Sequence, residues 1–135
     1  MISVELSTAL RSAGLRWKPA TGDRFVITQN EMAGEVFVLS DMTVEVHQLP
    51  QGAVIGFNGT TEWALDSVED RHALWLPRET QLRELLAGTF RTLDRTSEGW
   101  RVRVEVGGAE AEFVDADPEQ AYGGALLHLL SFIEV

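Results

Sequence analysis

The sequence predicts an α+β fold in which helices pack on an antiparallel sheet of about six to seven strands. Three observations lead to this prediction. Apolar residues recur at helical spacing at both ends of the chain, in 3–13 and 118–133. Short runs rich in valine, isoleucine and phenylalanine fill 24–57, as is typical of strands. Two alternating segments, 100–106 and 109–114, flank a Gly-Gly pair and have the pattern of a hairpin. The expected order is α-β(3-4)-α-α-β(3)-α.

The first helix has clear end signals. Ser3 can cap its N-terminus, and Gly14 can end it in the left-handed conformation, followed by an apolar contact between Leu15 and Leu10. Three or four strands follow in 24–57, with a tight turn around Pro50.

Two helices are expected in the middle of the chain. Thr60 or Thr61 can cap a short helix that runs through Val68 and points Trp63 inward. A second helix in 78–88 buries one apolar face and ends at Gly88. That face consists of Leu82, Leu85 and Leu86.

The C-terminal third predicts a three-stranded meander and a helix. One hairpin turns near Ser97, and the next turns at Gly107-Gly108, which places Arg103 opposite Glu112. The core-facing residues are Val102, Val104, Val106, Ala109, Ala111 and Phe113. Asp117-Pro118-Glu119 opens the last helix. Gly123-Gly124 within it indicates a close approach of another backbone, such as the sheet.

Composition limits the function. The chain has 135 residues, which predicts a single domain over 1–135, and 44% of them are hydrophobic. No cysteine is present, which excludes disulfides and thiolate chemistry and fits a cytoplasmic location. No signal peptide or membrane-spanning run is expected. The net charge of −10 disfavours nucleic acid as a partner.

The charges are segregated along the chain. No Lys or Arg lies between Arg24 and Arg71, whereas the segment 71–103 contains seven arginines, its first and last residues included. Two interpretations are open. The arginines pair with acidic neighbours inside one fold, or they form a patch for a partner or a second copy of the chain.

One constellation could form a ligand or partner site. Glu45 and His47 lie two residues apart, so a strand would present both on one face, and a metal or acid–base site could begin this way. The turn with Asn58, Glu62 and Trp63 could lie near them. Against this, the sequence contains no P-loop, no HExxH spacing and no G-x-S-x-G elbow. We therefore expect no catalytic residue, no metal ligand and no cofactor.

Two resemblances add expectations. The segments VIGFNGTTEWALDSVE and LWLPRETQLRELL resemble a family of small uncharacterised proteins from high-GC bacteria that are sometimes labelled pilus assembly proteins. The label implies no mechanism here, because the chain has no P-loop lysine motif. In size, charge and element order the chain is also similar to class I type III secretion chaperones, which implies a dimeric protein that holds a partner chain.

The sequence therefore favours a non-catalytic cytoplasmic protein-interaction module, chaperone-like or adaptor-like, whose partner is another protein, itself as a homodimer, or both. The alternative is a small enzyme or ligand-binding domain with a pocket near Glu45, His47 and the 58–62 turn.

Overall fold

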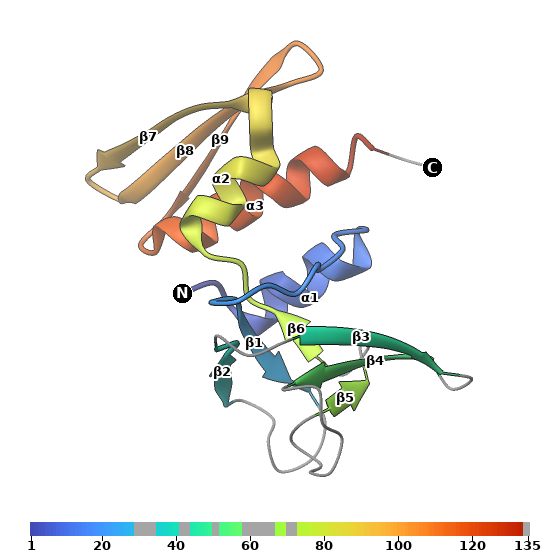
Figure 1. Ribbon diagram of the computed structural model, residues 1–135. Coiled ribbons are helices and arrows are strands. Elements are labelled where there is room, and N and C mark those ends of the chain that lie inside the picture. The colour runs from blue at the N-terminus through green and yellow to red at the C-terminus, as the bar shows by residue number, and fades with distance from the viewer. Residues whose placement is uncertain (29–34, 41–43, 50–51, 58–66, 70–72, 134–135) are drawn as a thin grey trace. The chain divides into compact units, whose positions relative to one another are not determined.

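The computed structural model describes residues 1–28, 35–40, 44–49, 52–57, 67–69 and 73–133 (Figure 1), and between 44 and 69 it describes the strand backbone. The chain forms two compact units. Unit 1 consists of Met1–Arg16 and Pro77–Val135, and unit 2 consists of Trp17–Leu76. The prediction of one domain over 1–135 stays a prediction.

Helix α1 (Val4–Ser12) has the ends that its sequence predicts. The Ser3 hydroxyl accepts the Leu6 N–H at 3.1 Å. At the other end Gly14 has φ 113°, and the Leu15 N–H donates to the Leu10 carbonyl at 3.0 Å. The helix therefore ends in a Schellman motif, which requires a residue that tolerates positive φ.

Unit 1 also contains a three-stranded antiparallel sheet of β7 (Phe90–Thr96), β8 (Gly99–Val106) and β9 (Ala109–Asp115), in that order. Gly107 and Gly108 form the turn between β8 and β9, with φ 61° and 80°. Two positive φ values define the type I′ turn that matches the twist of a hairpin. The predicted pairing of Arg103 with Glu112 is confirmed.

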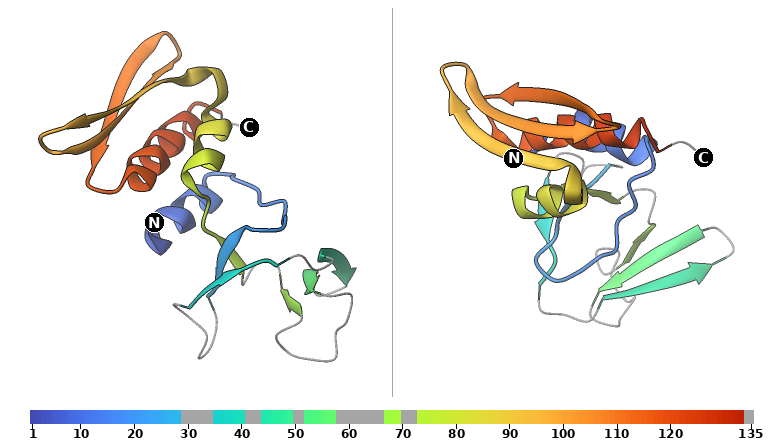
Figure 2. Two further views of the ribbon diagram at one scale, coloured as in Figure 1. Left: turned by 60° about the vertical axis from the view of Figure 1, so that its left-hand side comes forward. Right: turned by 90° about the horizontal axis from the view of Figure 1, so that it is seen from above.

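Helix α3 (Pro118–Leu130) covers one face of this sheet, and α1 and α2 (Glu79–Leu86) pack on α3 (Figures 1 and 2). The alternation of β8 explains the packing, because Val102, Val104 and Val106 lie on the helix side and are at most 5% exposed. The other buried apolar residues of unit 1 are Ile2, Leu10, Leu82, Leu86, Ala121, Tyr122, Ala125 and Leu126.

The two adjacent glycines of α3, Gly123 and Gly124, leave room for side chains from two different parts of unit 1. A Cβ on Gly123 would lie 2.5 Å from Leu6 Cδ2 and 3.0 Å from Ile2 Cδ1, both from the α1 end of the unit. A Cβ on Gly124 would lie 3.3 Å from Phe113 Cδ1 on β9. The predicted close approach therefore exists, but side chains make it rather than a backbone, and only Gly124 faces the sheet.

Helix α2 ends two residues before Gly88, the same spacing as between α1 and Gly14, but the positive φ is not on the glycine. The helix ends at Leu86, and a short 3₁₀ turn, η3 (Ala87–Thr89), follows it. The positive φ of 51° falls on Ala87, whereas the sequence predicts that Gly88 ends the helix. The sequence could not show this, because alanine rarely adopts that conformation and glycine does so readily.

Unit 2 contains two three-stranded antiparallel sheets. One has the order β2 (Val36–Val38), β1 (Arg24–Ile27), β6 (Ala73–Trp75), and the other has the order β3 (Val44–Leu49), β4 (Gly52–Phe57), β5 (Ser67–Glu69). Its buried apolar residues are Phe25, Val26, Leu39, Ala73, Leu74 and Leu76.

The α+β class is confirmed, and the single sheet of six to seven strands is wrong, since the described strands form separate three-stranded sheets. The predicted helix through Val68 is also wrong at its end, because Ser67–Glu69 is a strand that pairs with β4. Its beginning at Thr60 or Thr61 lies outside the described residues. Local periodicity identifies a strand but not the strand with which it pairs.

Candidate functional site

The residues predicted as a site are only partly described. Glu45 and His47 lie in β3, in register with Gly56 and Val54 of β4. Positions two residues apart in a strand share a face of its sheet, so positions 45 and 47 belong to the same face. Asn58, Glu62 and Trp63 lie outside the described residues, so their proximity to β3 stays a prediction.

The β-sheet register adds two positions to that face, which the sequence interpretation missed. In β5, Glu69 is in register with Val54, and Ser67 is in register with Gly56. The rows across the sheet are therefore His47–Val54–Glu69 and Glu45–Gly56–Ser67. The sequence predicts a helix at 67–68, and a helix cannot supply this row.

The three described tryptophans, Trp17, Trp75 and Trp100, are half-buried. Trp17 packs against Phe25 with ring centroids 5.5 Å apart, and its Nε1 donates to Asp23 Oδ2 at 2.8 Å. Trp100 lies under the Arg95 guanidinium, 5.1 Å from the ring centroid. Within the described residues, the buried Trp75 Nε1 has no hydrogen-bond partner.

The sheet of unit 1 has a polar face on the side opposite α3, which we call the outer face. By alternation and register it consists of Thr92, Asp94, Arg101, Arg103, Glu105, Glu110, Glu112 and Val114. Arg103 Nε donates to Glu112 Oε1 at 3.0 Å, and Arg101 pairs with Asp94. Arg91, on the edge strand β7, forms an ion pair with Glu105 at 3.3 Å. Three of the central arginines, Arg91, Arg101 and Arg103, are thus matched by acids of the same sheet, which favours the first interpretation of the charge segregation for that part of the chain.

These pairs are solvent-exposed, so each contributes little to stability. The hydrogen bond from Arg101 is the main cause that holds the pKa of the Asp94 carboxyl below its ordinary value of 3.8. A lowered folded-state pKa means that the pair's contribution is fully present above pH 3.8 and disappears as the pH falls through that lower value.

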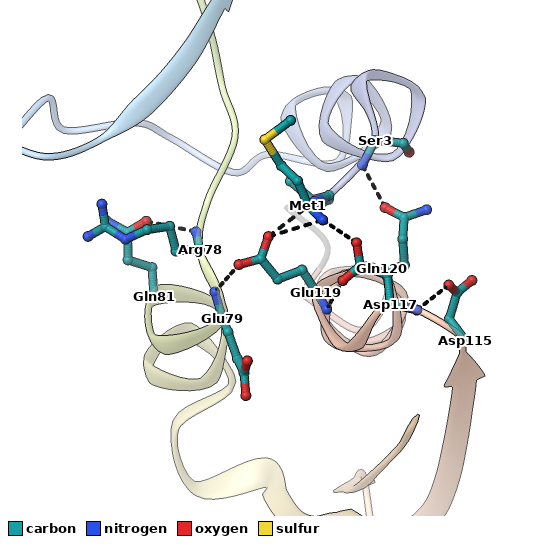
Figure 3. Close-up of polar contacts among 10 residues, drawn as sticks. Met1, Ser3, Arg78, Glu79, Gln81, Asp115, Asp117, Glu119 and Gln120 are labelled. Atoms are coloured by element: carbon teal, nitrogen blue, oxygen red, sulfur yellow. Dashed lines mark hydrogen bonds and ion pairs between the residues drawn. The ribbon is translucent and has the colours of Figure 1, made fainter. Parts of the chain in front are cut away.

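Three helix ends of unit 1 meet at Glu119 (Figure 3). This residue is in the first turn of α3, and its side chain is 14% exposed. Its Oε2 accepts the Glu79 N–H at 2.9 Å, which is the first N–H of α2. Its Oε1 accepts the Ile2 N–H at 3.2 Å, just before α1. One carboxylate therefore satisfies donors from two other helix ends, where negative charge is stabilised.

Neighbouring side chains extend this junction (Figure 3). Gln120 Oε1 accepts the Ser3 N–H at 2.6 Å, and Asp117 pairs with the Met1 amine. Asp117 Oδ1 also accepts the Glu119 N–H at 2.9 Å, which fixes the backbone that carries the carboxylate. The acids at the start of α3 are therefore engaged inside unit 1, and the junction holds the helix layer behind the sheet.

Tyr122 is the largest fully buried side chain of the described core. Its ring stacks on Phe90 with centroids 5.7 Å apart. No described group meets its hydroxyl with hydrogen-bond geometry. Burial raises the pKa of the phenol above its ordinary value of 10.0, although the nearby Arg83 guanidinium acts in the opposite direction.

We expect Tyr122 to make unit 1 sensitive to alkali. A raised folded-state pKa gives stability that is fully present below pH 10.0 and is lost as the pH rises through the folded value. Tyr122 is the sole tyrosine, so tyrosinate absorbance reports on it alone. The absorbance midpoint should exceed that of the urea-unfolded chain. Tyr122→Phe should change the free energy of unfolding at neutral pH by less than about 1 kcal/mol, because the lost hydroxyl has no partner. Coinciding midpoints in folded and unfolded chain would contradict the burial.

No metal or membrane feature stands out in the described parts of the chain. Among those residues, no group of three or more His, Asp or Glu side chains could hold a metal ion. No described helix combines the length and the apolar character that crossing a bilayer requires. The predicted cytoplasmic location stays a prediction.

Comparison with known proteins adds no relative. No family model matches the chain, and neither a curated protein nor a solved structure matches it.

Proposed function

We propose that this chain is a non-catalytic protein-interaction module that binds a partner polypeptide on the sheet of unit 1. The observation that carries the proposal is the one-sided cover of that sheet. Helix α3 packs on one face, and among the described residues of unit 1 no helix lies on the outer face. A three-stranded sheet with one covered face is a stable platform whose other face can bind.

The composition of the outer face supports a polypeptide as the partner. It combines ion pairs of both signs with Val114, an apolar side chain that is 42% exposed. A surface with mixed charges and an apolar contact is typical of the polar rim and the core of a protein interface. The junction at Glu119 supports the proposal too, because it holds together the helices behind the sheet.

Site-specific photo-crosslinking in the native host cells tests the proposal. A photoreactive amino acid replaces Thr92, an exposed outer-face residue. The matched control replaces Leu85, which is 37% exposed on α2. We expect a discrete protein adduct from position 92 that is absent from position 85. Equal adducts from both positions, or none from position 92, would contradict a binding role for the outer face.

A ligand-binding role for the β3–β4–β5 sheet is the second candidate. It is favoured by the register, which places Glu45, His47, Ser67 and Glu69 on one face. A fragment screen read by amide NMR tests it. Shifts confined to these strands that disappear in His47→Ala would support it, and a screen that shifts none of their amides would contradict it.

A further inference from the structure

The free edge of β9 has a defined pattern of backbone groups. The type I′ turn at Gly107-Gly108 makes Val106 and Ala109 a hydrogen-bonded pair. In an antiparallel ladder such pairs alternate with pairs whose N–H and C=O groups point away from the partner strand. Counting along the register, the backbone groups of Glu110, Glu112 and Val114 point away from β8.

Within the described part of the chain, no strand pairs with that edge, since β9 is terminal in the order β7-β8-β9. The two edges of the sheet differ. In β7 the register shifts between Phe90 and Thr92, and such a bulge interrupts an edge and discourages pairing. In β9 the register is continuous over its 7 residues, and the strand contains no proline. The edge of β9 is therefore the one that can accept another strand.

The charges of β9 indicate which strand fits. Its residues include three acids and no base. Glu110 lies directly opposite Glu105, and like charges in that position destabilise a sheet. The charge of Glu105 is balanced by an ion pair with Arg91 at 3.3 Å, whereas no described cation pairs with Glu110. A cation from outside would remove the repulsion.

A second copy of the chain fits this edge poorly. If the β9 strands of two copies paired in antiparallel fashion with Glu112 at the centre, each Glu112 would lie opposite the Glu112 of the other copy. Such a dimer would also bring together two chains that each have a net charge of −10. The same acids that disfavour self-pairing favour a basic strand, which is how charged edges select partners. Val114 then offers an apolar contact to a cross-strand neighbour.

We propose that the free edge of β9 binds an extended segment of a protein partner by strand addition, and that this segment carries lysine or arginine opposite Glu110 and Glu112. The inference rests on the proposed function, since it names the partner's chemistry and its place on the same sheet. Backbone hydrogen bonds would supply the affinity, and the basic side chains would supply the specificity.

The test uses a synthetic seven-residue peptide of alternating lysine and valine, titrated into the full chain and followed by amide NMR. We expect shifts at Glu110, Glu112 and Val114. Val114→Pro removes one outward N–H without touching the bonds to β8, and it should weaken binding about five- to tenfold. Val114→Thr keeps the N–H and the branched shape, and it should bind within about twofold of the parent. Glu110→Lys should weaken binding, whereas Glu98→Lys, the same charge change at the β7–β8 turn, should weaken it less.

A peptide of the same charge with proline at its centre separates strand addition from charge attraction. Equal binding of the two peptides, or a Val114→Pro variant that binds like the parent, would overturn the inference. A dimer of the parent chain in sedimentation that Val114→Pro dissociates would also overturn it, because a second copy would then occupy the edge. These results leave the proposed function intact, since crosslinks from position 92 do not depend on the edge.

Discussion

Gly123→Val should destabilise unit 1 by about 2–3 kcal/mol, the cost typical of overpacking a core. The new side chain would begin 2.5 Å from Leu6 Cδ2 and 3.2 Å from Leu6 Cγ, so the Leu6 side chain would have to leave its packed position or α1 would have to shift away from α3. The gain in helix propensity over glycine is below about 1 kcal/mol and cannot offset this. Urea unfolding followed by the NMR methyl signals of Val102 and Val104 measures the effect in unit 1 alone.

Two further variants show whether the contact with Leu6 is the cause. Gly88→Val adds the same side chain where nothing lies within 4 Å of a Cβ, so it should change the free energy of unfolding far less. Combining Gly123→Val with Leu6→Ala creates room for the valine. We expect the double variant to be more stable than the sum of the single costs by about 1 kcal/mol or more. Strictly additive costs would show that Gly123 does not accommodate Leu6.

Glu119→Ala should destabilise unit 1 by a similar amount, about 2–3 kcal/mol, because it leaves two partly buried backbone donors without their acceptor. These donors are the Glu79 N–H and the Ile2 N–H. Glu119→Gln keeps one side-chain carbonyl, so it should cost about half as much. Amide hydrogen exchange at Glu79 and Ile2 should accelerate in both variants, in the same order.

Glu84→Ala is the matched control for this prediction. Glu84 is an exposed glutamate of α2 and takes no part in the junction, so its loss should change stability by less than about 0.5 kcal/mol. If Glu119→Ala cost no more than Glu84→Ala, the junction would be a surface contact without structural importance.

The sequence predicts unit 1 well because its signals are local. Ser3, Gly14 and Gly107-Gly108 each act on the next few residues, and all three produce the expected caps and turn. The register of β8 with β9 follows from the length of that turn. The junction at Glu119 escapes sequence reasoning, because the dipole of its own helix already explains this acid. Its contact with Glu79 spans 40 residues and leaves no local pattern.

Unit 2 is predicted less well because one of its pairings joins strands that lie far apart in the sequence, and because its strands divide into two sheets. β1 pairs with β6, which lies more than forty residues further along the chain, and β2 does not pair with β3. Short apolar runs predict each strand but do not indicate with which other strand it pairs. The candidate site has the same weakness: the spacing of Glu45 and His47 identifies them, whereas Ser67 and Glu69 join their face only through β4.

Hydrogen exchange along β9 in the free protein tests most directly whether an edge of unit 1 is available to a partner. The register predicts an alternation, with protected amides at Ala111 and Phe113 and rapidly exchanging amides at Glu110, Glu112 and Val114. This pattern would show an unpaired edge in the chain without its partner. Uniform protection from Glu110 to Val114 would show that another segment already covers the edge, and it would contradict strand addition at β9.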